Sequence, residues 1–246
     1  MLYTLRMNEN KNILPIIVVV VLVLGLGFLM YRGQSPKATE LTPNDAVTQT
    51  ETTKKEMAVA KPYMLKDGNY TFNPAVSELM WSAKKTLIAT WVDSGTVMLK
   101  EGSVMVDGGK VTSGKIVVDM ASLAAKVTGK GDGQDSLTKH LKSADFFDVE
   151  KFPTSEFMLK TVESVGEGKY KADGDLTIKG MTKPLSTQLM AEEMADGSVV
   201  LSGKLMIDRT QYDVKFGSTK FFESLGDKAI DDIFEVDLKL VGAMVK

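Results

Sequence analysis

Apolar and polar residues alternate strictly along much of the chain after residue 67. In the clearest run, residues 169–178, the small or apolar members are Tyr170, Ala172, Gly174, Leu176 and Ile178. The same period of two recurs over residues 199–207 and 234–240. Successive side chains of a β-strand point to opposite faces, so this period predicts strands with one buried and one solvated face. Such strands are typical of antiparallel sheets.

Turn signals that contain glycine separate these runs. They are Asp107-Gly108-Gly109, Gly166-Glu167-Gly168, Lys179-Gly180 and Asp196-Gly197. Each suits a tight hairpin, because glycine tolerates positive φ. The pattern predicts about eight strands. They lie near Asn69–Asn73, Glu78–Lys84, Ser94–Lys100 continuing through Val104–Val106, Val111–Met120, Ser155–Ser164, Lys169–Lys179, Leu185–Glu192 with Ser198–Asp208, and Ile230–Val245.

Strands with one apolar face each must hide those faces together. A closed barrel does so and also removes both sheet edges. At about eight strands, the interior either fills with side chains or holds one small ligand. The inward set includes the small residues Ala172, Gly174 and Gly203, which leave room for a cavity, although tapering barrels also use small residues as plain packing. We therefore expect an all-β, eight-stranded antiparallel barrel and leave open whether its lumen is filled.

Only residues 134–153 depart from the strand pattern within this region. Leu137, His140 and Leu141 fall on one face of a short helix. We expect Asp135 or Ser136 to cap its first turn.

The same segment continues with two large rings, Phe146 and Phe147, between Asp145 and Asp148. We expect Pro153 to end the helical stretch, because proline disfavours α geometry at the residue before it. The segment therefore predicts a short helix that caps one end of the barrel, with both rings directed at the lumen.

An apolar run, Ile13–Met30, lies near the N-terminus. At ~1.5 Å per residue it nearly spans a ~30 Å hydrocarbon layer. It is either a cleaved signal peptide or an uncleaved transmembrane helix. We favour the anchor, because the run is long and Tyr31-Arg32-Gly33-Gln34 makes a poor cleavage site. An N-terminal segment of this kind most simply places the following domain outside the cytoplasm, in the periplasmic cell envelope.

The chain thus divides into three parts. Residues 1–33 are the membrane anchor or signal segment. Residues 34–66 form a flexible linker, rich in Thr, Lys, Glu and Ala and interrupted by Pro36, Pro43 and Pro62. Residues 67–246 form the barrel domain.

Composition excludes several classes of function. The formal net charge of −2 over 246 residues argues against nucleic-acid binding. The absence of cysteine excludes disulfides and thiolate chemistry, and a single histidine excludes a multi-histidine metal site. A hydrolase that pairs Ser136 or Ser143 with His140 stays open in principle, but we expect no catalytic residues, no metal and no obligatory cofactor.

Three segments, in order and spacing, resemble the signatures of the YceI-like family. They are HLKSADFFDV with KFPT at residues 140–149 and 151–154, GDLTIKGMTKP at 174–184, and IDRTQY with FG at 207–212 and 216–217. The resemblance covers about residues 68–245 and implies a lipocalin-like barrel that binds polyisoprenoids. One departure is that Asp93-Ser94-Gly95 stands where many members carry His-x-Gly, which implies a different head group or none.

The resemblance implies an extracytoplasmic lipid carrier whose bound molecule is a polyisoprenoid or an isoprenoid quinone. The alternative is an envelope stress or structural module without an obligatory ligand. The implied partners are this amphiphile and, through the N-terminal segment, the membrane, with homodimerisation left open. Candidate ligand contacts are Trp81, Trp91, Asp93, His140, Phe146, Phe147, Phe157, Arg209, Phe216, Phe221 and Phe222. Ordinary packing is the competing interpretation for each ring, and a structural ion pair for Arg209.

Overall fold

The computed structural model describes residues 61–88, 90–129, 131 and 133–245. The expected membrane segment, residues 13–30, and the expected linker up to residue 60 lie outside the described residues. Within the described ranges, no helix is long and apolar enough to cross a bilayer.

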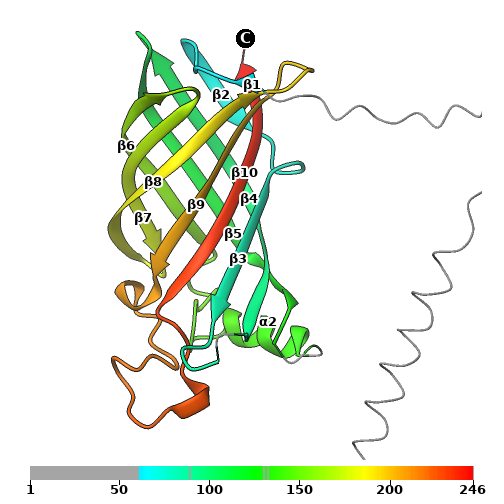
Figure 1. The fold of residues 1–246 in the computed structure, drawn as a ribbon, viewed down its shortest axis with the longest axis vertical. Helices are drawn as coiled ribbons and strands as arrows, with labels where there is room; N and C mark the ends of the chain where they lie inside the picture. The colour runs from blue at the N-terminus through cyan, green and yellow to red at the C-terminus, as the bar shows by residue number, and fades with distance from the viewer. Residues whose placement is uncertain (1–60, 89, 130, 132, 246) are drawn as a thin grey trace, which may run out of the picture. The chain divides into compact units, whose positions relative to one another are not determined.

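Antiparallel strands make up most of the described chain (Figure 1). One α-helix, α2 (Gln134–Lys142), and two 3-10 turns, η2 (Arg209–Tyr212) and η3 (Gly226–Lys228), accompany them. The strands are β1 (Lys61–Pro62), β2 (Gly68–Phe72), β3 (Glu78–Lys84), β4 (Val92–Asp107), β5 (Lys110–Val127), β6 (Thr154–Gly166), β7 (Lys169–Ile178), β8 (Met181–Glu193), β9 (Val199–Asp208) and β10 (Ile233–Val245).

The sheet closes on itself with eight strand positions. From β4 to β10, each strand pairs with the next one along the chain. The eighth position is shared by β2 and β3, which both pair with β10 on one side and with β4 on the other. This confirms the predicted eight-stranded antiparallel barrel.

The assignment of strands to positions differs from the sequence prediction in two places. Grouping residues 185–192 with 198–208 as one strand was wrong, because the turn at Asp196-Gly197 folds β8 and β9 into a hairpin in which they pair. Conversely, β2 and β3 do not occupy separate positions. A turn in which the Asn73 carbonyl accepts the Ser77 N–H (3.1 Å) interrupts one strand position without reversing the chain.

The helix α2 lies at one end of the barrel, away from β2 and the C-terminal end of β10 (Figure 1). Its N-cap is Gly133, with no side-chain cap hydrogen bond, so the predicted caps Asp135 and Ser136 were wrong. It ends at Lys142, because the backbone of Ser143 is extended. The helix therefore stops well before Pro153, which was expected to end it. The Thr138 hydroxyl accepts the N–H of Ala125 on β5 (2.9 Å) and holds the helix against the barrel.

Three tyrosines fill the opposite end. Tyr63, Tyr70 and Tyr170 are all buried. The Tyr70 hydroxyl accepts the Lys66 N–H and donates to the Lys66 carbonyl, both at 3.0 Å, and the Tyr170 hydroxyl accepts the N–H of Leu65 (2.8 Å). The last residues of the expected linker therefore pack across this end of the barrel.

Burial of Tyr70 makes stability depend on alkaline pH. Burial, with a smaller contribution from the Tyr63 hydroxyl, raises the pKa of Tyr70 to about 12, whereas an unfolded tyrosine titrates near ~10. The folded state then holds a proton that the unfolded state has lost. This stabilisation is complete below pH ~10 and is lost as pH rises towards 12. We expect the free energy of unfolding to fall more steeply over this window in the wild type than in Tyr70→Phe. Urea titrations at a series of pH values measure this free energy. If it fell with pH equally steeply in the two proteins, the prediction would be wrong.

Candidate ligand-binding site

An apolar cavity of about 180 Å³ occupies the barrel lumen. Every one of the eight strand positions contributes to its wall. One representative from each position is Leu79, Val97, Ile116, Phe157, Leu176, Leu189, Leu205 and Val236. The lumen is therefore neither empty of side chains nor fully packed.

Several leucines that point inward are only half-buried. Leu189, Leu205 and Leu238 line the cavity, and part of each side chain stays accessible. Close-packed interiors leave few voids larger than a water molecule. The accessible surface of these leucines is what a bound apolar group would cover.

The two rings of the cap segment lie in the cavity wall. Phe146 is 5% exposed and packs beside Phe147, with ring centroids 6.5 Å apart. Phe147 also meets Phe234 of β10 edge-on, at 6.3 Å. Both rings line the cavity, as expected for a cap directed at the lumen; that they contact a ligand stays a prediction.

His140 lies behind this wall. Its ring packs edge-on against Phe146 (4.9 Å) and Phe216 (4.7 Å), and its Nε2 is 3.4 Å from an Asp145 carboxylate oxygen. The Ser143 hydroxyl donates to the His140 backbone carbonyl (2.7 Å), not to its imidazole. His140 thus joins the helical cap to the loop after η2, and this arrangement does not favour a serine–histidine nucleophile.

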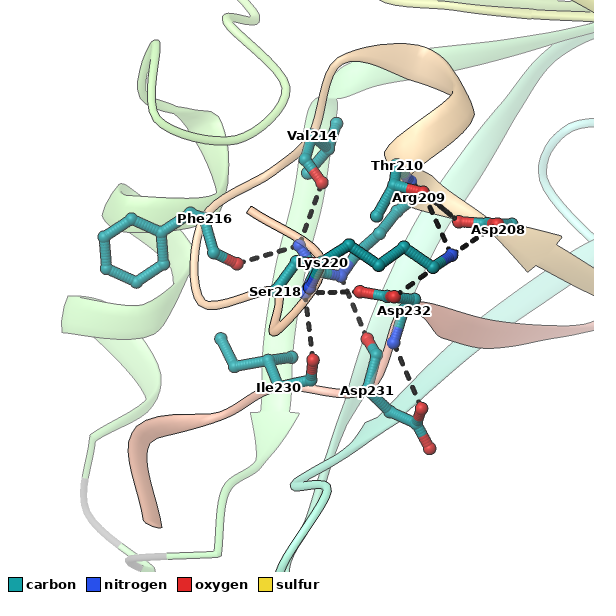
Figure 2. A network of polar contacts seen from close by, with 10 residues as sticks. All are labelled: Asp208, Arg209, Thr210, Val214, Phe216, Ser218, Lys220, Ile230, Asp231 and Asp232. Atoms are coloured by element: carbon teal, nitrogen blue, oxygen red, sulfur yellow. Dashed lines mark hydrogen bonds and ion pairs between the residues drawn. The ribbon is translucent and has the colours of Figure 1, made fainter. Parts of the chain in front are cut away.

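Arg209 is buried, with 4% exposure, where β9 ends. Figure 2 shows its guanidinium among main-chain carbonyls from two segments. It donates to the carbonyls of Val214 (2.9 Å), Phe216 (2.8 Å), Ile230 (3.0 Å) and Asp231 (2.9 Å). Its remaining side faces Asp232, with nitrogen and oxygen 3.6 Å apart. The structural ion pair weighed at the sequence level is present, and the donors hold the chain between η2 and β10.

Electrostatics around Arg209 follow from this packing. Burial lowers the pKa of the guanidinium, while Asp232 and Asp208 oppose that shift. Burial alone would raise the pKa of Asp208, but hydrogen bonds from Thr210 and Lys220 outweigh it and lower that pKa. Lys220 also pairs with Asp232 at 3.1 Å (Figure 2).

The remaining predicted contacts divide into two groups. Trp81 and Phe157 line the cavity, and so does Arg209. Trp91 and Asp93 lie outside it: the Asp93 carboxylate accepts the Gly129 N–H (2.9 Å) and the Trp91 indole N–H (3.3 Å). Asp93 therefore stabilises the loop at Gly129 and lies outside the cavity.

Phe216, Phe221 and Phe222 also lie outside the cavity wall. Phe221 and Phe222 are each 48% exposed. Lys215 lies over the Phe221 ring, 5.2 Å from its centroid. The structure thus brings Trp81, Phe146, Phe147, Phe157 and Arg209 together, and places the other candidates around or beyond the cap.

Sequence reasoning overlooked the aliphatic part of the cavity wall. Val236, Leu238 and Leu240 alternate with polar residues, so their position on an inward face was visible in the pattern. They carry no chemically distinctive group, and the candidate ligand contacts were chosen mainly among aromatic residues. The tyrosine-filled end had no such signal, because it depends on contacts between segments far apart in the chain.

Comparison with known proteins agrees with this architecture. A model of the YceI-like domain matches residues 70–242. A UPF0312 protein of Pseudomonas putida (strain W619) is 36% identical over 92 residues, which are 37% of this chain and 45% of that protein. A UPF0312 protein of Azotobacter vinelandii is 32% identical over 130 residues, 52% of this chain and 60% of that protein. The matches span about half the length of these curated relatives.

Two solved structures share the fold. BcnA of Burkholderia cenocepacia is 21% identical, with a TM-score of 0.51, and the match covers 69% of this chain and 98% of that one. A polyisoprenoid binding domain from Saccharophagus degradans, implicated in plant cell wall breakdown, is 15% identical, with a TM-score of 0.52, covering 72% and 98%.

The Arg209 network generates a stability prediction. Arg209→Lys keeps the charge but cannot reach four carbonyls, so buried carbonyl oxygens lose their donors. We expect a loss of about 2–4 kcal/mol in the free energy of unfolding and faster amide exchange over residues 213–232. Lys220→Gln removes a half-exposed ion-pair partner, which solvent screens, and should cost clearly less than Arg209→Lys. Urea titration and hydrogen exchange measure both. Equal losses in the two variants would refute the assignment of the anchoring role to Arg209.

Proposed function

Because this chain belongs to the YceI-like domain family, we propose that its barrel binds an isoprenoid lipid, either a polyisoprenoid or an isoprenoid quinone, in the lumen. The apolar cavity walled by all eight strand positions carries this proposal. The similarity in fold to a polyisoprenoid binding domain supports it.

An apolar lumen suits such a ligand on energetic grounds. Removing apolar surface from water yields roughly 25 cal/mol per Å², so a few hundred Å² gives useful affinity without charged contacts. An engineered cavity of ~150 Å³ binds benzene. A void of about 180 Å³ therefore holds roughly one ring or one to two isoprene units. A longer tail needs the half-buried wall leucines to move aside.

We also propose that the protein works in the cell envelope, outside the cytoplasm, with residues 13–30 as its anchor. The apolar run and its poor cleavage signal support this placement. In this setting the barrel would sequester or carry a lipid taken from the adjacent membrane. We assign no catalytic step to the domain.

The alternative is an interaction module without an obligatory ligand. The exposed rings of Phe216, Phe221 and Phe222 favour it, since large apolar side chains at a surface often mark contact sites. A ligand-free module gives no reason for a cavity in the lumen, so we favour lipid binding.

Protein purified from its native host tests the proposal directly. Organic extraction followed by mass spectrometry should release about one isoprenoid per barrel. Recovery of only bulk membrane phospholipid, at the level of a control membrane protein, would count against it.

A matched pair of variants locates the site. Leu205 faces the lumen and Met206, its neighbour on β9, faces outward with 52% exposure. Leu205→Trp fills the void, so we expect at least tenfold weaker isoprenoid binding, with stability changed by less than about 1–2 kcal/mol. Met206→Trp should bind like the wild type. Titration calorimetry with a short isoprenoid quinone measures both, and unchanged binding by Leu205→Trp would place the lipid outside the lumen.

A further inference from the structure

Three exposed phenylalanines lie in the loop that joins η2 to β10. Phe216 is 42% exposed, and Phe221 and Phe222 are exposed to a similar degree. No other phenylalanine among the described residues is as exposed. This loop, drawn in orange in Figure 1, extends beyond α2 at its end of the barrel. We call residues 216–222 the aromatic tip.

Buried anchors hold the aromatic tip in place. Ser218 is fully buried, and its carbonyl accepts the N–H groups of Phe221 and Phe222, both at 3.1 Å. The Ser218 hydroxyl accepts the Lys220 N–H (3.2 Å), and Arg209 binds the carbonyl two residues before Ser218 (2.8 Å). A hydrogen-bonded turn therefore presents the rings to water, although their exposure is unfavourable.

Phe216 connects the aromatic tip to the cavity wall. Its ring centroid lies 5.3 Å from that of Phe146, and Phe146 lines the cavity. The Phe216 ring also packs edge-on against His140 of α2 (4.7 Å). The exposed surface and the cavity wall thus meet across a single ring contact at the capped end of the barrel.

The charges around the rings balance. Residues 213–228 carry three lysines and three acidic residues, which are Lys215, Lys220, Lys228, Asp213, Glu223 and Asp227. Lys215 pairs with Asp213 at 2.6 Å. Lys220 pairs with two aspartates outside this stretch, both at 3.1 Å. The aromatic tip therefore offers apolar surface without an excess of positive charge, which does not fit a polyanionic partner such as nucleic acid.

The rings expose too little surface for a stable protein interface. A phenylalanine can bury ~150–250 Å², so three rings that are nearly half exposed present roughly 300 Å². Leu87, exposed on the adjacent loop between β3 and β4, adds little to this total. Stable interfaces bury about 800 Å² on each partner. A bilayer sets no such requirement, because individual apolar side chains can enter its headgroup boundary.

The proposed anchor would keep the barrel beside such a bilayer. Residues 31–60 separate the apolar run from β1, and a stretch of this length can span at most ~100 Å. The longest strand, β5, has 18 residues, which corresponds to ~60 Å. This stretch is therefore long enough for the α2 end of the barrel to reach the membrane, although β1 lies at the tyrosine-filled end (Figure 1).

We propose that the aromatic tip is a membrane-docking surface, and that Phe221 and Phe222 enter the headgroup boundary of a bilayer. Docking would bring the capped end of the barrel, with Phe146 in its cavity wall, against the membrane. The use of this contact to load a lipid rests on the proposed lipid-binding function, whereas docking itself does not. Because the tip carries no excess of positive charge, docking does not require anionic lipid.

A single fluorescent label tests this contact in the full chain. The chain has no cysteine, so Phe222→Cys gives one site for an aromatic nitrobenzoxadiazole label, which takes the place of the ring. The labelled chain is reconstituted in phosphatidylcholine vesicles, with and without lipid that carries a spin label near the headgroup. We expect this lipid to quench the label roughly threefold or more above a control site.

Val165→Cys provides the matched control site. Val165 is 62% exposed and precedes the turn between β6 and β7, at the tyrosine-filled end of the barrel. Its label should stay in water, because this end faces away from the docked membrane. Equal quenching at positions 165 and 222 would overturn the proposal.

Removing the rings tests their role. The label is moved to Thr219→Cys, an exposed position within the aromatic tip. In that background Phe221→Ser combined with Phe222→Ser should lower quenching roughly threefold or more, because the apolar groups are gone. Met206→Ser, which removes an exposed apolar side chain from β9, should leave quenching unchanged. Urea titration shows that each variant is folded. Unchanged quenching in the double variant would refute docking through these rings.

Lipid composition and protein density separate the alternatives. Quenching at Phe222→Cys should agree within about twofold between phosphatidylcholine vesicles and vesicles that also contain phosphatidylglycerol. A contact formed only on the anionic vesicles would overturn its apolar basis. A signal that depends on the number of protein molecules per vesicle and not on the spin-labelled lipid would mean that a second copy of the chain covers the rings. An isoprenoid recovered by extraction together with an unquenched tip would defeat docking alone and leave the proposed lipid-binding function standing.

Discussion

Closure of the sheet through the shared β2 and β3 position is the constraint on which the rest of the structure depends. Both short strands hydrogen-bond to β4 and to β10, so the sheet has no free edge between them. Once it is closed, every inward side chain faces the same enclosed volume. The cavity is what remains because the inward side chains do not fill that volume.

Polar chemistry is concentrated at the two ends of the barrel. At one end, tyrosine hydroxyls bind the main chain of residues 65 and 66. At the other, Arg209 binds four carbonyls, and His140 is held between Phe146 and Phe216. Both sets join segments that are far apart in the chain. The middle of the lumen is left apolar.

Much of the barrel was predictable from the sequence, because a period of two is a local property. Residues 78–84, for example, are a strand in the structure as predicted. The sharing of one position by β2 and β3 was not predictable, since it depends on which distant strand each segment pairs with. The helix caps were mistaken because the N-cap position falls on Gly133, so Asp135 and Ser136 lie inside the first turn of α2 and not before it.

The candidate site was predictable only in part. The place of Phe146 and Phe147 in the cavity wall was predictable, because the amphipathic pattern of the cap segment lies in one continuous stretch of sequence. Trp91 was a candidate as a large ring, and Asp93 because it stands where many family members carry histidine. The Asp93 carboxylate instead accepts the N–H of Gly129, far along the chain, and the indole N–H of Trp91. No pattern in the sequence reveals that the donors of Arg209 are already occupied by main-chain carbonyls.

The hydrogen bonds of the Arg209 anchor go to the main chain of the segment that it holds, and only Asp232 adds a side-chain ion pair, at 3.6 Å. Its acceptors at Val214, Phe216, Ile230 and Asp231 are carbonyl oxygens, which every amino acid supplies. The outward side chains of that loop can therefore diverge or be exchanged without loosening its attachment. This end of the barrel is a natural place for grafting new recognition sequences, by evolution or by design, onto an unchanged frame.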